Sequence, residues 1–229
     1  MGIAAGSSPD GRAARSPNRR GEGTRLRADI LAAATDLLDH GDERAVTLRA
    51  VARRAGIATP SIYPHFPDRS AIVLAVVRAA FGELSGRLGA AVDAAGDDPR
   101  QRLYAVCHAY LDFAAAHPER YRAMSGDIRS PSVANGVAIA NDPACPGAGA
   151  LRILAGILAD CVAAGYSTST DPFADAVALW LGLHGFAHQR AVTRTFPWPA
   201  DLVRRFVSPL SHIGPVGPRT SAEPLDQSR

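Results

Sequence analysis

The segment Thr47–Phe66, TLRAVARRAGIATPSIYPHF, constrains the fold of this chain more than any other stretch. Thr47 carries the hydroxyl that an N-cap residue uses to accept a hydrogen bond from an unpaired amide of the first turn. Gly56 lies where a helix ends in the left-handed conformation, which glycine adopts without a Cβ clash. The apolar residues between them recur with helical spacing: Leu48, Val51, Ala52 and Ala55. The segment therefore predicts a short helix that closes in a tight turn.

A second helix is predicted directly after this turn. We expect Thr59 to be its N-cap and Pro60 its first residue, because proline at that position loses no hydrogen bond. Ile62 and Phe66 should face inward, and Pro67 should end the helix after about two turns. A short helix with small and polar residues at its start suits readout of DNA base edges. The alternative interpretation is an ordinary helical hairpin whose polar residues face water.

Polar and basic side chains in this segment are candidates for contacts with DNA. Hydroxyl and guanidinium groups suit phosphates and base edges, and an alanine methyl group suits the methyl group of thymine. For His65 the alternative is that it only supports Tyr63. The candidate residues are Arg49, Ala58, Thr59, Ser61, Tyr63, His65 and Arg69.

Longer stretches around the segment carry a family resemblance. The stretches ILAAATDLLDHG, VTLRAVARRAGIA and TPSIYPHFPDRSAIVLAVV resemble the DNA-binding domain of the TetR/AcrR transcriptional regulators, over Arg25 to about Leu84. Pro64 is a departure, because the family more often has a residue with a backbone donor there. A proline removes that amide, so a shortened helix is expected at this point.

A second resemblance lies in the C-terminal half. The stretches AYLDFAAAHPERYRAMSG and LWLGLHGFAHQRA resemble the WHG-type C-terminal domain found in one branch of these regulators. The Trp-x-x-x-His-Gly pattern of that domain falls on Trp180, His184 and Gly185. We expect His184 to make a buried hydrogen bond next to a close helix contact at Gly185.

The predicted architecture is all-α, with an N-terminal three-helix DNA-binding unit followed by a helical bundle for effector binding and dimerisation. The predicted helices cover about 25–40, 48–55, 60–66, 69–93, 99–117, 118–124, 148–164, 172–194 and 200–213. The predicted segments are a disordered basic arm (1–24), a DNA-binding domain that includes the linking helix (25–95), an effector-binding and dimerisation domain (96–213) and a disordered tail (214–229).

The basic arm has two interpretations. Residues 1–27 are rich in glycine, serine and proline and contain six arginines against Asp10 and Glu22, a composition that favours disorder. The arm either follows DNA phosphates and enters the minor groove, as other N-terminal arms do, or is a solubilising tail.

The resemblance implies a ligand-responsive regulator, most often a repressor, that binds a palindromic operator on double-stranded DNA as a homodimer. One short recognition helix contacts too few base pairs for specificity, which also favours a two-fold dimer. We expect the dimer face on the helices over 172–194 and 200–213. The alternative is a regulator without a small-molecule effector, constitutive or controlled by a protein partner.

Aromatic and histidine side chains of the second domain are candidates for an effector pocket, since helical bundles hold ligands between helices. The alternative is that they form ordinary core with polar edges. The candidates are Tyr104, His108, Phe113, His117, Trp180 and His184.

Several other functions are disfavoured by the sequence. There is no glycine-rich phosphate loop, no Gly-x-Ser-x-Gly and no compact acid–base cluster, so we expect no enzyme and no cofactor. His184 and His188 lie four residues apart without a third ligand at a familiar spacing, so no metal is expected. No apolar run reaches membrane-spanning length and no signal peptide is recognised, so a cytoplasmic protein is expected.

The cysteines show no CxxC spacing, which favours reduced thiols. Cys107 and Cys161 lie in apolar helical stretches and are predicted to be core. Cys145 lies in a loop, and a redox-sensing role is its alternative interpretation.

Overall fold

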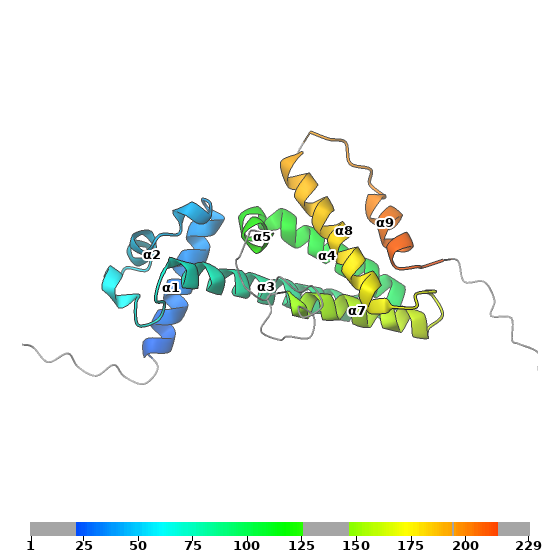
Figure 1. The fold of residues 1–229 in the computed structure, drawn as a ribbon, viewed down its shortest axis with the longest axis horizontal. Helices are drawn as coiled ribbons and strands as arrows, with labels where there is room; N and C mark the ends of the chain where they lie inside the picture. The colour runs from blue at the N-terminus through cyan, green and yellow to red at the C-terminus, as the bar shows by residue number, and fades with distance from the viewer. Residues whose placement is uncertain (1–21, 126–146, 194, 215–229) are drawn as a thin grey trace, which may run out of the picture.

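The computed structural model describes residues 22–125, 147–193 and 195–214, and within them the chain is all-α, as predicted (Figure 1). An isolated antiparallel bridge joins Ser167 and Ile213. No described helix is both long enough and apolar enough to cross a membrane. The elements are α1 (Glu22–Asp39), η1 (Glu43–Ala45), α2 (Leu48–Arg54), η2 (Thr59–Ser61), α3 (Arg69–Ala94), α4 (Pro99–Ala116), α5 (Pro118–Ser125), α7 (Ala148–Ala163), α8 (Pro172–Val192) and α9 (Leu202–Leu210).

The first helix begins before its predicted start. α1 starts at Glu22, so it includes three residues that were assigned to the basic arm. The rest of the predicted arm, residues 1–21, lies outside the described residues, as do the tail from residue 215 and Cys145. Cys107 and Cys161 are fully buried, which confirms their prediction as core residues.

Helix α2 forms as its sequence predicts. The Thr47 hydroxyl accepts a hydrogen bond from the backbone amide of Ala50 at 3.2 Å. Gly56 has φ +67°, the left-handed conformation expected of it. Val51 and Ala52 are buried against α1, while the arginines of the helix face outward.

The predicted second helix of this unit is much shorter than expected. It is a single 3-10 turn, η2, whose N-cap is Ala58 and not Thr59. The amide of Ser61 donates to the carbonyl of Ala58 at 2.9 Å, so the first turn closes one residue earlier than predicted. Pro64 has no amide with which to extend regular helix, and turns continue through His65 to the buried Phe66.

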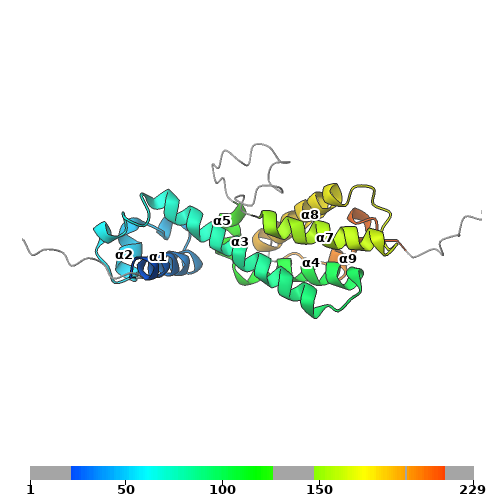
Figure 2. The same ribbon diagram turned by 90° about the horizontal axis from the view of Figure 1, so that it is seen from below.

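Helix α3 connects two separate clusters of buried side chains. The helix begins at its predicted residue, and its N-cap Asp68 accepts from the Ala71 amide at 2.8 Å. In Figure 2 the helix leaves the unit of α1 and α2 and runs along the C-terminal bundle to its far end. Its Ile72, Val76 and Val77 belong to the N-terminal core, and its later residues Ala80, Leu84 and Leu88 belong to the C-terminal core.

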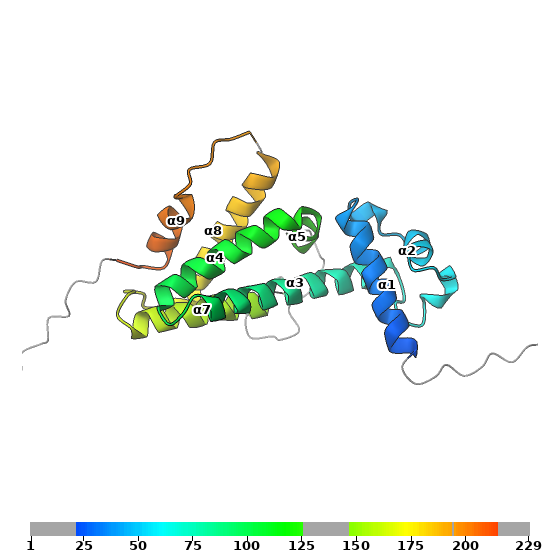
Figure 3. The ribbon, with the colours of Figure 1, turned by 180° about the vertical axis from the view of Figure 1, so that it is seen from behind.

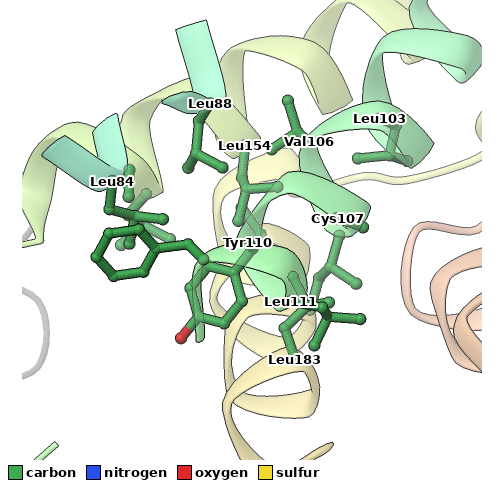
Figure 4. Close-up of a cluster of buried hydrophobic side chains, with 14 of the residues drawn as sticks. Leu84, Leu88, Leu103, Val106, Cys107, Tyr110, Leu111, Leu154 and Leu183 are labelled. Carbon is green, nitrogen blue, oxygen red and sulfur yellow. The ribbon is translucent and has the colours of Figure 1, made fainter. Parts of the chain in front are cut away.

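The C-terminal bundle packs α4 against α3, α7 and α8 (Figure 3). Figure 4 shows residues of this core: Leu84 and Leu88 from α3, Leu154 from α7, Leu183 from α8 and several side chains of α4. Helices α4 and α8 begin at their predicted residues, and Asp98 and Asp171 cap them through their side chains. The last two helices end earlier than expected, at Val192 and Leu210.

Candidate nucleic-acid interface

The turn after α2 is fixed on its inner side by buried residues and backbone hydrogen bonds. The amide of Ile57 donates to the carbonyl of Ala52 at 2.9 Å, so the chain reverses directly over α2. Ile62 and Phe66 are 0% and 2% exposed in the N-terminal core, as predicted. Tyr63 lies between them and is 53% exposed, which makes it one of the few large apolar side chains on the described surface.

The predicted DNA contacts differ in how accessible they are. Arg49, Ala58 and Tyr63 are exposed, and the remaining four candidates are partly buried: Thr59, Ser61, His65 and Arg69. His65 lies close to the start of α1, because a Cβ placed on Gly23 would be 3.8 Å from its ring. The fold thus gathers exposed and partly buried candidates from α2, η2 and the following turns on the N-terminal unit.

Arg69 makes contacts inside the protein that its sequence position did not predict. Its Nε donates to the carbonyl of Val46 at 2.8 Å, and its Nη2 donates to the carbonyl of Glu43 at 2.5 Å. Nη2 also lies 3.2 Å from the Glu43 carboxylate. These bonds tie the first residue of α3 to the segment between α1 and α2. In this structure Arg69 therefore braces the unit, and its contact with DNA stays a prediction.

Another arginine, Arg27 of α1, stacks on the far side of the same turn. Its guanidinium carbon lies 4.8 Å from the centre of the Phe66 ring. Arg54 is engaged as well, with its Nε 2.6 Å from an Asp36 carboxylate oxygen. That pair lowers the pKa of Asp36, chiefly through the hydrogen bond from Arg54. Neither contact has a local sequence signal, because Arg27 and Phe66, like Arg54 and Asp36, lie far apart in the sequence.

In the C-terminal bundle, His184 makes the half-buried hydrogen bond that was predicted for it. The Tyr121 hydroxyl lies 2.8 Å from its Nδ1 and 3.1 Å from its carbonyl oxygen, and the Tyr110 hydroxyl lies 3.3 Å from Nδ1. The Trp180 ring packs against it with centroids 5.7 Å apart. Burial lowers the pKa of His184, with a smaller effect from His188, and burial raises the pKa of Tyr110.

Within the single chain, the close helix contact predicted at Gly185 does not form. Gly185 is exposed, and a Cβ added to it would meet nothing within 4 Å. The close approach lies one turn earlier at Gly182, where an added Cβ would be 3.2 Å from Leu210 of α9. The reason is the phase of α8, which turns Gly182 and not Gly185 toward α9.

The six candidates for an effector pocket do not gather at one place. Trp180 and His184 meet each other, and Phe113 packs against His117 with ring centroids 5.1 Å apart. Tyr104 instead bonds to Ser208 of α9 at 2.7 Å. The sixth candidate, His108, is exposed.

A groove lies elsewhere, between α4, α5 and α8, and none of the six candidates lines it. It encloses a cavity of about 360 Å³. Its lining residues are Leu111, Ala114, Ala115, Pro118, Arg122, Ala187, Arg190 and Ala191. Sequence reasoning missed it because the lining residues come from three separate helices and give no local signal.

Helix α5 links the N-terminal unit to the bundle. Arg120 makes a two-pronged pair with Asp39 of α1, with N–O distances of 2.6 Å and 2.5 Å, and a third bond of 2.6 Å to Glu83 of α3. Two residues of α5, Ala123 and Met124, pack in the N-terminal core. This helix therefore holds both cores at once.

The predicted dimer face is only partly exposed in the single chain. Phe173, Val177, Trp180, Phe186, Phe206 and Leu210 are partly buried against the C-terminal core. Leu181 is 56% exposed, and Val192 and Phe196, at and after the end of α8, are 61% and 50% exposed. Apolar surface therefore remains on and after α8.

Comparison with known proteins gives two family matches. Residues 30–76 match the family described as bacterial regulatory proteins, tetR family, and residues 103–211 match the tetracyclin repressor-like C-terminal domain. Together these matches cover α2 and η2, most of α1, and the bundle from α4 to α9. They do not test the WHG subtype.

Relatives and solved structures agree with these matches. The HTH-type transcriptional activator FasR of Mycolicibacterium smegmatis is 30% identical over 132 residues, which cover 55% of this chain and 59% of FasR, less than two thirds of its length. A protein of unknown function from Rhodococcus sp. RHA1 is 29% identical with a TM-score of 0.67, over 86% of this chain and 95% of that one. The fatty acid degradation regulator FadR from Bacillus halodurans has the same fold at 16% identity, with a TM-score of 0.59 over 80% of this chain and 95% of that one.

Proposed function

The chain belongs to the TetR family of bacterial regulatory proteins, and we propose on that basis that it is a sequence-specific DNA-binding transcriptional regulator. Tyr63 carries this proposal. Its side chain is 53% exposed, while the neighbouring Ile62 and the nearby Phe66 are buried and fix the backbone from which it projects. An exposed phenol on a rigid turn suits a hydrogen bond to a DNA phosphate. Arg49, Thr59 and Ser61 supply the other polar groups of the proposed contact surface.

We propose that the regulator acts as a homodimer on a palindromic operator. A dimer can contact two half-sites that lie about one helical turn apart. It therefore contacts twice as many base pairs as a single copy does. The apolar surface at Leu181, Val192 and Phe196 supports a dimer face on and after α8.

The dimer is tested by light scattering with size-exclusion chromatography. A charged residue in an apolar interface is left without a partner, so Leu181→Glu should shift the protein toward monomer. The matched control is Arg152→Glu at an exposed position of α7, which should leave the association state unchanged. A wild-type protein that is strictly monomeric would remove this part of the proposal.

We further propose that a small molecule controls DNA binding through the C-terminal bundle, and that the bound regulator represses. The link through α5 supports such control, because Arg120 and Tyr121 are neighbours that hold α1 and α8 respectively. FasR is named an activator, so a promoter–reporter assay with and without the regulator is needed to measure whether this protein lowers or raises transcription. A thermal-shift screen with metabolites separates this proposal from a regulator without a small-molecule effector.

DNA binding is tested with operator fragments selected from random DNA. In a dimer, Tyr63→Ala removes two hydrogen bonds to charged phosphates of about 1.5–3 kcal/mol each, so affinity should fall by at least about 100-fold. Tyr63→Phe should lose nearly as much, because it keeps the ring and removes only the hydroxyl. Circular dichroism should show an unchanged fold for both. Wild-type affinity of Tyr63→Ala in a gel-shift assay would contradict the proposal.

A further inference from the structure

The groove between α4, α5 and α8 has the size and lining of a small-molecule site. Its cavity of about 360 Å³ falls near the lower end of the roughly 300–1,000 Å³ found for ligand pockets. Half of its lining residues are alanines: Ala114 and Ala115 from α4, and Ala187 and Ala191 from α8. Short side chains on facing helices leave an apolar trough where larger ones would fill the space.

Two arginines line this trough, and one of them, Arg190, gives it a positive charge that no carboxylate of the described residues compensates. Arg122 comes from α5 and Arg190 from α8, so they belong to different walls. Arg122 is 63% exposed and pairs with Glu119 of its own helix. Arg190 lies over the Phe186 ring at 5.6 Å and has no carboxylate partner among the residues that the structure describes. A guanidinium presents a planar fork of donors that matches a carboxylate or a phosphate.

We propose that this groove binds an amphipathic anion. The apolar body of the ligand lies along the alanine walls, and its acidic group bonds to Arg190, with Arg122 adding positive charge from the opposite wall. A neutral apolar molecule would leave these charges unused, and a small anion would leave the trough unfilled. The geometry thus selects a ligand that carries both parts.

The position of α5 connects this site with the N-terminal unit, and this step rests on the proposed function. Pro118 and Arg122 of α5 line the groove, while Arg120 of the same helix bonds to Asp39 of α1. A ligand in contact with α5 favours whichever position of that helix it binds better, and so shifts the equilibrium between arrangements of α1. Occupancy of the groove therefore changes the affinity for the operator.

The experiment is isothermal titration calorimetry of the full chain with decanoate. Decan-1-ol and butyrate are the matched controls, because each lacks one of the two parts. We expect saturable binding of decanoate, at least about 10-fold weaker binding in Arg190→Gln, where a hydrogen bond to a charged group is lost, and weaker binding of both control ligands. Ala115→Leu places bulk into the groove from an exposed position and should also abolish binding. Arg152→Gln, an exposed arginine on α7, should bind as wild type does.

The proposal is overturned if decanoate shows no saturable binding, or if Arg190→Gln and Ala115→Leu both bind it as wild type does. A gel-shift assay with decanoate tests the regulatory step separately. Binding in the groove with no change in operator affinity would overturn the connection through α5 and support the site alone. A wild-type protein that selects no operator counts against the proposed function, and the calorimetry still decides the site.

Discussion

Replacing Arg120 with alanine should destabilise the protein by about 2 kcal/mol. Arg120 joins three helices, because it pairs with Asp39 of α1 and Glu83 of α3 from its own position on α5. Its side chain is only 15% exposed, and the two carboxylates are 24% and 36% exposed. Truncation leaves both carboxylates partly buried without this cation.

The expected loss of stability follows from how deeply the Arg120 cluster is buried, because exposed and buried ion pairs differ in free energy. Exposed ion pairs contribute about 0–1 kcal/mol, and removing one partner of a fully buried pair costs about 3–5 kcal/mol. The exposed fractions place Arg120 between these limits, which gives about 2 kcal/mol. For a chain of this size the melting temperature should fall by roughly 4–8 °C.

The assay is urea and thermal unfolding at fixed protein concentration, since association changes apparent stability. Arg205→Ala is the matched control, because its pair with Asp201 is 68% and 42% exposed and should contribute less than about 0.5 kcal/mol. A double-mutant cycle with Asp39→Ala should give a coupling energy above about 1 kcal/mol. If Arg120→Ala costs no more than Arg205→Ala, the reasoning from burial is refuted.

Four further outcomes are expected. Gly56→Ala should cost about 1 kcal/mol in urea unfolding, because φ is +67° and a Cβ would meet nothing that adds to the strain. Asp68→Ala removes the N-cap of α3 and should also cost about 1 kcal/mol, whereas Asp68→Asn should cost less. Burial lowers the pKa of His184 from 6.5, so the unfolded state binds more protons below that pH. The melting temperature should therefore fall as pH drops through about 6.5, and a His184→Asn variant with an undiminished slope would contradict the assignment. Burial raises the pKa of Cys107 to about 12, so a thiol reagent should leave it unmodified in the folded protein, as mass spectrometry can detect.

The features predicted correctly are those determined by residues close in sequence. Thr47, Asp68, Asp98 and Asp171 all cap helices through their side chains, and each cap acts on an amide two or three residues away. The start of η2 was predicted wrongly although it is local. Thr59 was expected as the N-cap from its hydroxyl, but Ala58 occupies that position without a side-chain cap, because the amide of Ser61 bonds to the carbonyl of Ala58.

Contacts between distant helices were beyond single-sequence reasoning. Helix α4 buries side chains around much of its circumference, so periodicity does not say which face meets α3, α7 or α8. Tyr104 and Phe113 were therefore grouped in one pocket although they lie with different neighbours. The pair of Arg120 with Asp39 joins residues 81 positions apart and leaves no local pattern.

The length of α3 limits how far the angle of this helix can vary in the proposed dimer. Its 26 residues span about 39 Å at 1.5 Å per residue. Because its beginning lies in one core and the rest in the other, tilting it by about 5° about its far end moves the near end by roughly 3.4 Å, the rise of one base pair. A change of a few degrees in the angle of α3 would therefore alter the distance between the two DNA-contacting units, so that they no longer match the spacing of the two half-sites. Under the proposed function, the C-terminal bundle must therefore fix the angle of α3 to within a few degrees, and a ligand that turned α3 by about 5° would move each DNA-contacting unit by about one base pair.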